Sequence, residues 1–362
     1  MSGAEYFSAT VPEADRRFEA AAARARARFE RIPHPLLGPA GEPLALSVAA
    51  IGPASASNAL VISSGIHGVE GFAGAAIQTG LLTGSDPLPA DTRLVLVHAV
   101  NPWGMAWNRR EDHENIDVFR NLLYWRRPII PDPLYDEIDT ALDLAHWPDA
   151  RERIDAQRMK LVAEHGLPRL IAAVRRGQHH RPDGLTYHGQ GQCWSALTLQ
   201  HVADRWLSGA KRIAWIDVHT GFGEPGGALV MSYETRGNPA DQRLDAWFDG
   251  AIYRPGEDAD IPPHEARPFG WVEEHVPGST VTALILEFGT EPPEVTRDLF
   301  PASTHYHRYG DPRSLQARAV DVRVRRFCYP ERHEWKKSVW AHGAAVARRT
   351  ARGLAAWAAE TP

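Results

Sequence analysis

The chain has 362 residues, and its 40 Lys and Arg against 45 Asp and Glu leave a formal net charge of −5. Hydrophobic and charged contents of 43% and 23% are ordinary for a globular protein, which excludes disordered and fibrous classes. The mildly acidic balance disfavours a nucleic-acid-binding protein, since such proteins usually carry a basic domain.

Features of secreted and membrane proteins are not visible in the sequence. The first twenty residues lack a basic segment followed by an apolar one, and no segment approaches the roughly 20 apolar residues of a membrane helix. Two cysteines, Cys193 and Cys328, are too few for a disulfide scaffold. We therefore expect a cytoplasmic protein with no membrane or nucleic-acid partner; its oligomeric state cannot be predicted.

The predicted elements alternate between helices and strands. An Ala-, Glu- and Arg-rich helix over 11–31 comes first, followed by a turn segment at 34–43, and further helices are predicted at 71–82 and about 337–359. Continuous apolar runs, typical of buried and largely parallel strands, occur at 58–63, 93–100, 212–218, 227–232 and 280–288. This alternation predicts an α/β fold with helices on both faces of the sheet.

The pattern changes between residues 121 and 209. Helices are predicted at 134–144 and 151–176, and a polar segment rich in His and Gly follows at 178–192. No change of composition there resembles a linker, so we interpret residues 1–362 as a single domain with an elaboration at about 121–209.

Ionisable residues follow three of the predicted strands. In open α/β sheets, ligands bind at the carboxyl ends of the strands. His67 and Glu70 follow the first strand on a loop to which Gly65 and Gly68 give freedom, and His219 follows the strand at 212–218. Two histidines and a carboxylate are a common ligand set of catalytic zinc. The alternative is a histidine that caps a strand beside an exposed glutamate.

Glu287 lies inside the apolar strand at 280–288. Burying a carboxylate there is costly unless it is paired or functional. Next to a zinc-bound water it could act as a general base and return the proton to a leaving amine. The alternative is a glutamate bonded to the backbone or to an arginine.

Three arginines, Arg109, Arg110 and Arg120, occur in the polar, turn-rich segment 101–121. A guanidinium group binds carboxylates through two parallel hydrogen bonds and can polarise a carbonyl. The same segment could equally be a solvated surface loop.

These motifs occur in a characteristic order: G-x-H-G-x-E, N-P-x-G, R-x-x-x-x-x-x-D-x-x-R-N, D-x-H-T-G and L-E-F-G-T. As an ordered set, they resemble the zinc carboxypeptidase superfamily. The segments SSGIHGVEGFAGAAIQ and HPLLGPAGEPLAL resemble an uncharacterised bacterial branch of it, over nearly the whole chain from about Tyr6. The resemblance implies an α/β fold of three layers, in which a mixed, mainly parallel eight-stranded sheet lies between helices.

The resemblance also implies roles for the metal and the reacting groups. His67, Glu70 and His219 would bind a single zinc ion per chain. Glu287 would be the general base and acid toward a zinc-activated water, and Arg110 would polarise the scissile carbonyl.

Further roles concern the substrate. Arg120 would hold the substrate carboxylate, with Arg109 as a second substrate-binding residue, and Asp117 would orient His67. Asp217, two residues before His219, has a structural interpretation. The chain departs from the family at Phe119, where an Asn usually forms part of the carboxylate clamp.

The implied function is a metallocarboxypeptidase-like hydrolase that cleaves an amide bond next to a carboxylate-bearing residue of a small peptide or an N-acyl amino acid. Digestive members carry Arg where this chain has Val69, and the H-G-x-E form is closer to the aspartoacylase and succinylglutamate desuccinylase group. A deacylase of small N-acyl amino acids is therefore one alternative. A non-catalytic binding protein on the same scaffold is the other.

Overall fold

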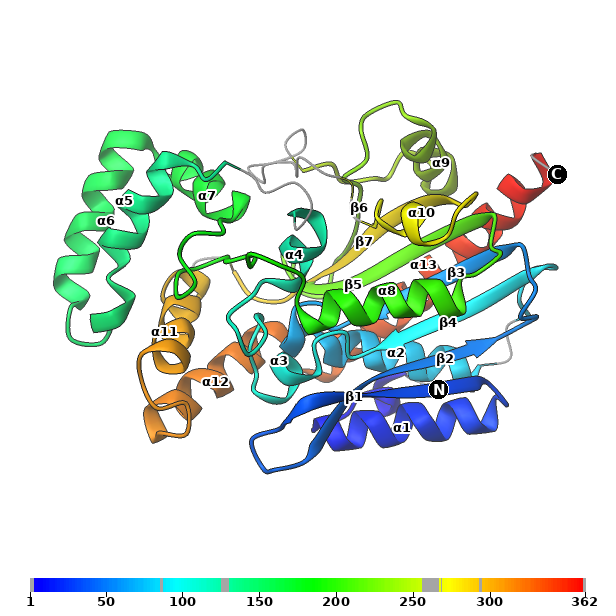
Figure 1. Cartoon of the computed structure of the whole chain (residues 1–362), viewed down its shortest axis with the longest axis horizontal. Coiled ribbons are helices and arrows are strands. Elements are labelled where there is room, and N and C mark those ends of the chain that lie inside the picture. Colours follow the sequence, from blue (N-terminus) through cyan, green and yellow to red (C-terminus); the bar gives the residue numbers. More distant parts are fainter. Residues whose placement is uncertain are drawn as a thin grey trace.

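The computed structural model describes residues 3–84, 87–124, 130–255, 267, 269–292 and 295–360. Its centre is a sheet with the strand order β1-β2-β4-β3-β5-β7-β6 (Figure 1). The strands are β1 (Arg28–Leu37), β2 (Pro43–Ile51), β3 (Asn58–Ser64), β4 (Thr92–His98), β5 (Arg212–Gly221), β6 (Ala228–Met231) and β7 (Thr280–Gly289). All five apolar runs of the sequence form strands of this sheet.

The sheet is mixed. Three neighbouring pairs are parallel, namely β3 with β4, β3 with β5 and β5 with β7. Three are antiparallel, namely β1 with β2, β2 with β4 and β6 with β7. The described residues form seven strands, and the antiparallel pairings equal the parallel ones in number. The prediction of eight mainly parallel strands was therefore wrong in both respects.

The two strands that the sequence analysis missed are β1 and β2. Most of β1 is exposed or half-buried and it contains Pro33 and Pro35, as an edge strand can, so it shows no continuous apolar run. Strand β2 is buried, but three of its nine residues are alanine, which is depleted in strands. The helix predicted over 11–31 correspondingly ends at Arg24, and Arg26 with φ 53° turns the chain into β1.

Helices cover both faces of the sheet, which confirms the three-layer α/β prediction. Successive strand residues contribute to two separate cores, as Leu60 and Ile62 do on one face and Val61 on the other. The first core is covered by α1 (Val11–Arg24), α2 (Gly71–Thr83), α9 (Pro239–Phe248) and α13 (His333–Glu360). The second is covered by α4 (Val118–Tyr124), α8 (Trp194–Trp206) and α10 (Val272–His275).

The remaining helices lie near the end of the sheet at which the parallel strands finish (Figure 1). They are α3 (Pro102–Ala106), α5 (Pro133–Leu142), α6 (Arg151–His165), α7 (Leu167–Arg176), α11 (Thr296–Arg308) and α12 (Leu315–Cys328), with short 3-10 turns η1 (Ala4–Tyr6), η2 (Gly68–Glu70) and η3 (Leu144–His146). The helix predicted over 151–176 is two helices, because Gly166 takes φ 79° and Pro168 follows it. No described helix is both long and apolar enough to cross a bilayer.

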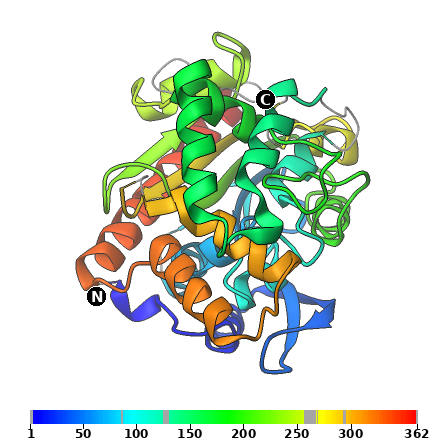
Figure 2. The same cartoon turned by 90° about the vertical axis from the view of Figure 1, so that its left-hand side faces the viewer.

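The elaboration predicted at about 121–209 contains α5, α6, α7 and α8; residues 125–129 within it lie outside the described residues. Helices α5 to α7 share a small apolar core that includes Leu134, Leu161 and Leu170. A second cluster joins α6 and η3 to α11 and α12 (Figure 2). The elaboration is therefore packed against the end of the molecule that carries α11 and α12.

Asn121 attaches the polar segment 178–192 to α4. Its side chain is fully buried, and Nδ2 donates to the carbonyl oxygens of His188 (2.8 Å) and Gly191 (2.7 Å), while Oδ1 accepts from the backbone N–H of Cys193 (3.1 Å). One amide side chain thus satisfies three backbone groups ahead of α8.

We expect Asn121→Asp to lower the free energy of unfolding by about 2–4 kcal/mol. The substitution keeps the shape but turns two donated hydrogen bonds into contacts between a carboxylate and carbonyl oxygens, and each buried group left unsatisfied costs about 1–3 kcal/mol. Urea unfolding would measure the change. The same chemical change at exposed Gln316 (Gln316→Glu) should alter stability by less than about 0.5 kcal/mol; equal effects would contradict the assigned role.

Candidate metal centre

The loop after β3 directs His67 and Glu70 toward one point. Gly65 and Gly68 have φ values of 76° and 39°, and a Cβ on Gly68 would lie 2.2 Å from the carbonyl oxygen of Arg109. The backbone N–H of Val69 donates to that same oxygen at 2.9 Å. Only glycine fits such a close approach, so the loop is fixed by backbone contact with the segment before Arg110.

Neighbouring strands supply the other two side chains. Strand β5 lies between β3 and β7, and His219 of β5 is the direct partner of Glu287 in the parallel register. The carboxyl ends of three adjacent parallel strands therefore bring His67, Glu70, His219 and Glu287 together, as the sequence predicted.

His67, Glu70 and His219 form a buried group in which one potential ligand atom from each residue lies within 4.8 Å of the others. The Glu70 carboxylate lies between the two rings, 3.5 Å from Nδ1 of His67 and 3.4 Å from Nδ1 of His219. Ligands at about 2.0–2.1 Å from a tetrahedral zinc ion are about 3.3–3.4 Å apart. The donor atoms and their spacing therefore fit a divalent metal ion such as zinc.

The second nitrogen of each imidazole contacts an aspartate. His67 Nε2 is 3.3 Å from Asp117 Oδ1, and His219 Nε2 is 2.6 Å from Asp217 Oδ2. Such contacts fix the ring and its tautomer, so that Nδ1 of both rings is left to face a metal. The contact of Asp117 is the one the sequence analysis expected.

Asp217 was given only a structural interpretation. Its other oxygen accepts a hydrogen bond from Ser63 Oγ at 2.5 Å, and Ser63 in turn accepts from Trp215 Nε1 at 2.7 Å. The sequence did contain a signal for the contact with His219, because residues two apart in a strand point to the same face of the sheet.

The charges around the centre favour a bound cation. Burial opposes ionisation of Asp117, but Arg120 and His67 outweigh it and hold the pKa of this carboxyl well below its usual range. Burial likewise opposes the charge on Glu70, and His67, His219 and Arg110 outweigh it, so its pKa is also low. Both carboxylates are therefore ionised at neutral pH.

The pKa of the Glu287 carboxyl is shifted in the opposite direction. Burial raises its pKa, the charge of Glu70 adds to this, and the nearby His219 opposes it, which leaves the pKa at about 7. Its Oε1 accepts a hydrogen bond from the backbone N–H of Phe222 at 2.9 Å. The side chain is thus held beside the metal ligands without an ion pair to neutralise it in the described part of the chain.

Two adjacent arginines point to different places. Arg110 is at the metal centre, where Nε donates to Glu70 Oε1 and Nη2 lies near His67 Nδ1, both at 3.0 Å. Arg109 is buried and donates to Glu111 Oε2 (2.7 Å), Asn115 Oδ1 (2.9 Å) and the carbonyl oxygen of Ser303 in α11 (3.1 Å).

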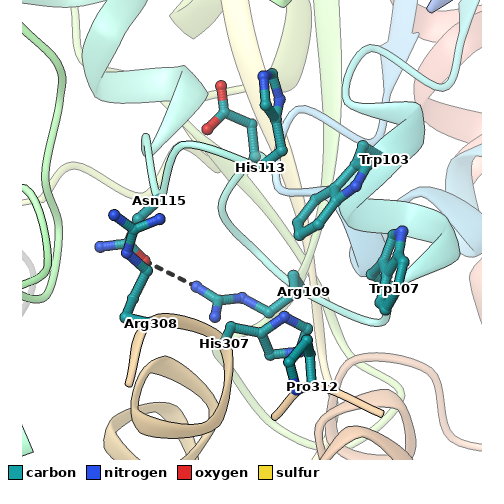
Figure 3. A pocket seen from close by; sticks show the side chains of 9 residues that line it. Trp103, Trp107, Arg109, His113, Asn115, His307, Arg308 and Pro312 are labelled. Atoms are coloured by element: carbon teal, nitrogen blue, oxygen red, sulfur yellow. Dashed lines mark hydrogen bonds between the residues drawn. The ribbon is translucent and has the colours of Figure 1, made fainter. Parts of the chain in front are cut away.

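Arg109 lines a small cavity of about 90 Å³ with Trp103, Trp107 and His307 (Figure 3). None of the candidate metal ligands lines this cavity. The guanidinium of Arg109 therefore ties the 101–121 segment to α11, and the structure shows no contact that would support its expected substrate-binding role.

Arg120 is also engaged within the protein. Its Nη1 pairs with Asp117 Oδ2, and Nε and Nη2 donate to the carbonyl oxygen of Arg175 at 3.0 and 2.7 Å. Beside it, the Phe119 ring lies 5.9 Å from the ring of His67, 5.6 Å from that of His219 and 6.4 Å from that of Tyr233, measured between centroids. Phe119 therefore gives the centre an apolar wall.

The fold and the site define a three-layer α/β protein with a candidate site for a divalent metal ion. Within this class, the chain belongs to the family described as protein of unknown function (DUF2817), whose model matches residues 7–342. No curated protein matches the sequence.

Several solved structures are similar to this chain. Thrombin activatable fibrinolysis inhibitor is 13% identical, with a TM-score of 0.44, and the match covers 93% of this chain and 74% of that one. A candidate metallopeptidase from Shewanella amazonensis is 14% identical, with a TM-score of 0.42 and coverage of 82% and 91%. Succinylglutamate desuccinylase from Chromobacterium violaceum is 15% identical, with a TM-score of 0.35 and coverage of 87% and 74%.

We expect His67→Ala to abolish the binding of a single zinc ion per chain, and Asp217→Asn to weaken it about 10- to 100-fold, because the second variant removes only the carboxylate that orients His219. Competition with a chromophoric chelator would measure both affinities. Asp204→Asn is the matched control, since Asp204 contacts His275 Nδ1 at 3.0 Å in a pair between α8 and α10. Zinc binding unchanged in Asp217→Asn would show that Asp217 does not support the metal centre.

Proposed function

We propose that this protein is a zinc-dependent hydrolase that cleaves an amide bond next to a carboxylate-bearing residue, with the whole chain acting as one catalytic unit. The observation that supports this most directly is the buried group His67, Glu70 and His219 with Glu287 at the adjacent position of the next strand. A carboxylate that is not a ligand but lies beside three ligands is the arrangement that metal-assisted hydrolysis needs.

The two histidines would hold a single zinc ion through Nδ1, and Glu70 would hold it through its carboxylate. When bound, zinc supplies Lewis acidity, which polarises a carbonyl oxygen and lowers the pKa of water at the site. The aspartates behind the histidines keep the rings oriented for this purpose.

Glu287 would move the proton. Because Oε1 accepts from the backbone N–H of Phe222, the carboxylate has a fixed orientation and Oε2 remains to take a proton from the attacking water. The same oxygen would then return the proton to the leaving amine, as a general acid.

Arg110 would act on the substrate carbonyl. Its Nη2 lies 3.0 Å from His67 Nδ1, whose lone pair a metal ion would occupy. With that acceptor taken, the Nη2 group is left to donate to a carbonyl oxygen while Nε keeps its hydrogen bond to Glu70. A guanidinium is suited to stabilise the negative charge that develops there.

A deacylase of small N-acyl amino acids is a second candidate. The elaboration contacts the motif segment directly, because Asp117 donates its N–H to the carbonyl oxygen of Tyr187 at 2.7 Å and Arg120 donates to that of Arg175. Its position against the metal centre favours a small substrate over a long peptide. The third candidate is a binding protein without catalysis. Such a protein would not require the carboxylate of Glu287 beside the three candidate ligands.

We expect Glu287→Gln to keep zinc binding and lose at least about 100-fold in kcat, because only the proton transfer is removed. Elemental analysis and steady-state kinetics on the best substrate would measure the two properties. Glu291→Gln, close by in sequence and paired with Arg332, is the control for the same change outside the site. Full activity of Glu287→Gln would exclude Glu287 as the general base.

A panel that pairs N-acyl amino acids with dipeptides of the same C-terminal residue should distinguish the two hydrolase candidates. If the elaboration limits the acyl side, kcat/KM should be at least about tenfold higher for the N-acyl amino acids, which corresponds to about 1.4 kcal/mol. The reverse preference would identify a peptidase. Zinc-loaded protein that hydrolyses neither set would favour the binding protein.

A further inference from the structure

Arg175 lies at the edge of the candidate metal centre, and the residues that the structure describes give its guanidinium no ion-pair partner. It is the penultimate residue of α7 and is half-buried. Within the part of the chain that the structure describes, no carboxylate or carbonyl group accepts a hydrogen bond from its guanidinium. A charged group that loses hydration without gaining a partner is costly, and such a group indicates a ligand that supplies the missing acceptor.

Contacts with the motif segment fix the position of Arg175. Its carbonyl oxygen accepts two hydrogen bonds from Arg120, whose Nη1 pairs with Asp117, and Asp117 contacts the ring of His67. Gly177, two residues further along the chain, has φ 83°, and a Cβ there would lie 2.7 Å from Cδ of Arg120. The end of α7 is therefore held close to a metal ligand.

Residues of the candidate site act electrostatically on Arg175. Burial lowers the pKa of Arg175, and the charges of Arg120 and Arg110 lower it further, against the opposing influence of Tyr233. Tyr233 in turn interacts electrostatically with Glu287 and packs against Phe119. Arg175 therefore lies within electrostatic reach of two further arginines and of Tyr233, which acts in turn on Glu287.

The other arginines nearby are already engaged. All three guanidinium nitrogens of Arg120 donate within the protein, and Arg110 contacts Glu70. The neighbouring Arg176 acts electrostatically on Asp132 instead. Arg175 is the arginine of this group that remains to bind an anion.

We propose that Arg175 binds the carboxylate of the substrate and that Arg120 is a positioning residue, which holds Asp117 and the end of α7. This inference rests on the proposed function in that it identifies the substrate-binding residue of the same site. The substrate class is an acid with a free carboxylate next to the scissile amide and an apolar side chain that packs against Phe119 and Tyr233. An N-acyl amino acid and the C-terminus of a peptide present the same group.

Equilibrium binding tests this without turnover. In zinc-loaded Glu287→Gln protein, calorimetric titration would compare N-acetyl-L-phenylalanine with N-acetyl-L-phenylalaninamide, which has the same shape without the charge. We expect the acid to bind at least about tenfold more tightly. Adding Arg175→Met should weaken binding of the acid at least about tenfold and leave the amide unchanged, since a charge-assisted pair contributes roughly 1.5–3 kcal/mol. Arg175→Lys should restore part of the preference.

Arg176→Met, which removes the same charge from the same helix end, is the matched control and should keep the preference for the acid. Melting temperature and zinc content would establish that each variant is folded and loaded. Equal binding of acid and amide, binding of neither, or a preference that survives Arg175→Met would overturn the inference. The inference would also be overturned if zinc-loaded Arg120→Met protein lost the preference for the acid while Arg175→Met protein retained this preference. Loss of the preference in Arg175→Met with no hydrolysis of any amide would instead leave this inference standing and refute the proposed function.

Discussion

The arrangement of the candidate metal centre depends on how the Glu70 carboxylate is held. A buried carboxylate is costly unless donors surround it, and Glu70 receives them from Arg110 Nε at 3.0 Å and from the backbone N–H of Thr220 at 3.1 Å. The second of these joins the loop after β3 to strand β5. Since both imidazoles face the same carboxylate, this connection sets the distance between His67 and His219 and defines a space for one cation.

The supporting contacts of the two histidines extend into different parts of the fold. Asp217 lies in the sheet and its contact with Ser63 belongs to the core, so the orientation of His219 is as rigid as the strands. Asp117 is held by Arg120, which also holds the end of α7. The elaboration is thus connected to His67 through side chains, and a ligand bound at α7 would act on the same network that orients a metal ligand.

The parts of this arrangement that follow local periodicity were predictable. His67, Glu70, His219 and Glu287 each follow or lie in an apolar run, and parallel strands bring such positions to one edge. Strands β1 and β2 were missed because one is an exposed edge and the other is rich in alanine. The motif that ends at Asn121 begins at Arg110 and gives Arg110 a place in the site, but it does not show that the side chain of Arg109 points toward α11. Arg175 belongs to no motif, and its position depends on the interruption of the helix at Gly166 and on the contacts of its carbonyl oxygen with Arg120.

Phe119 and Arg175 are connected through Arg120, the neighbour of the first and the hydrogen-bond partner of the second. The family resemblance led us to expect Asn at position 119, and Phe119 instead places an aromatic ring beside both histidines. Beside it, Arg120 pairs with Asp117 and with the carbonyl oxygen of Arg175. That contact holds the end of α7, which carries Arg175, next to the motif segment. If Arg175 binds the substrate carboxylate, as we propose, the anion-binding charge comes from the elaboration and not from the motif segment, and the apolar ring of Phe119 stands where the family resemblance led us to expect a polar group of the carboxylate clamp.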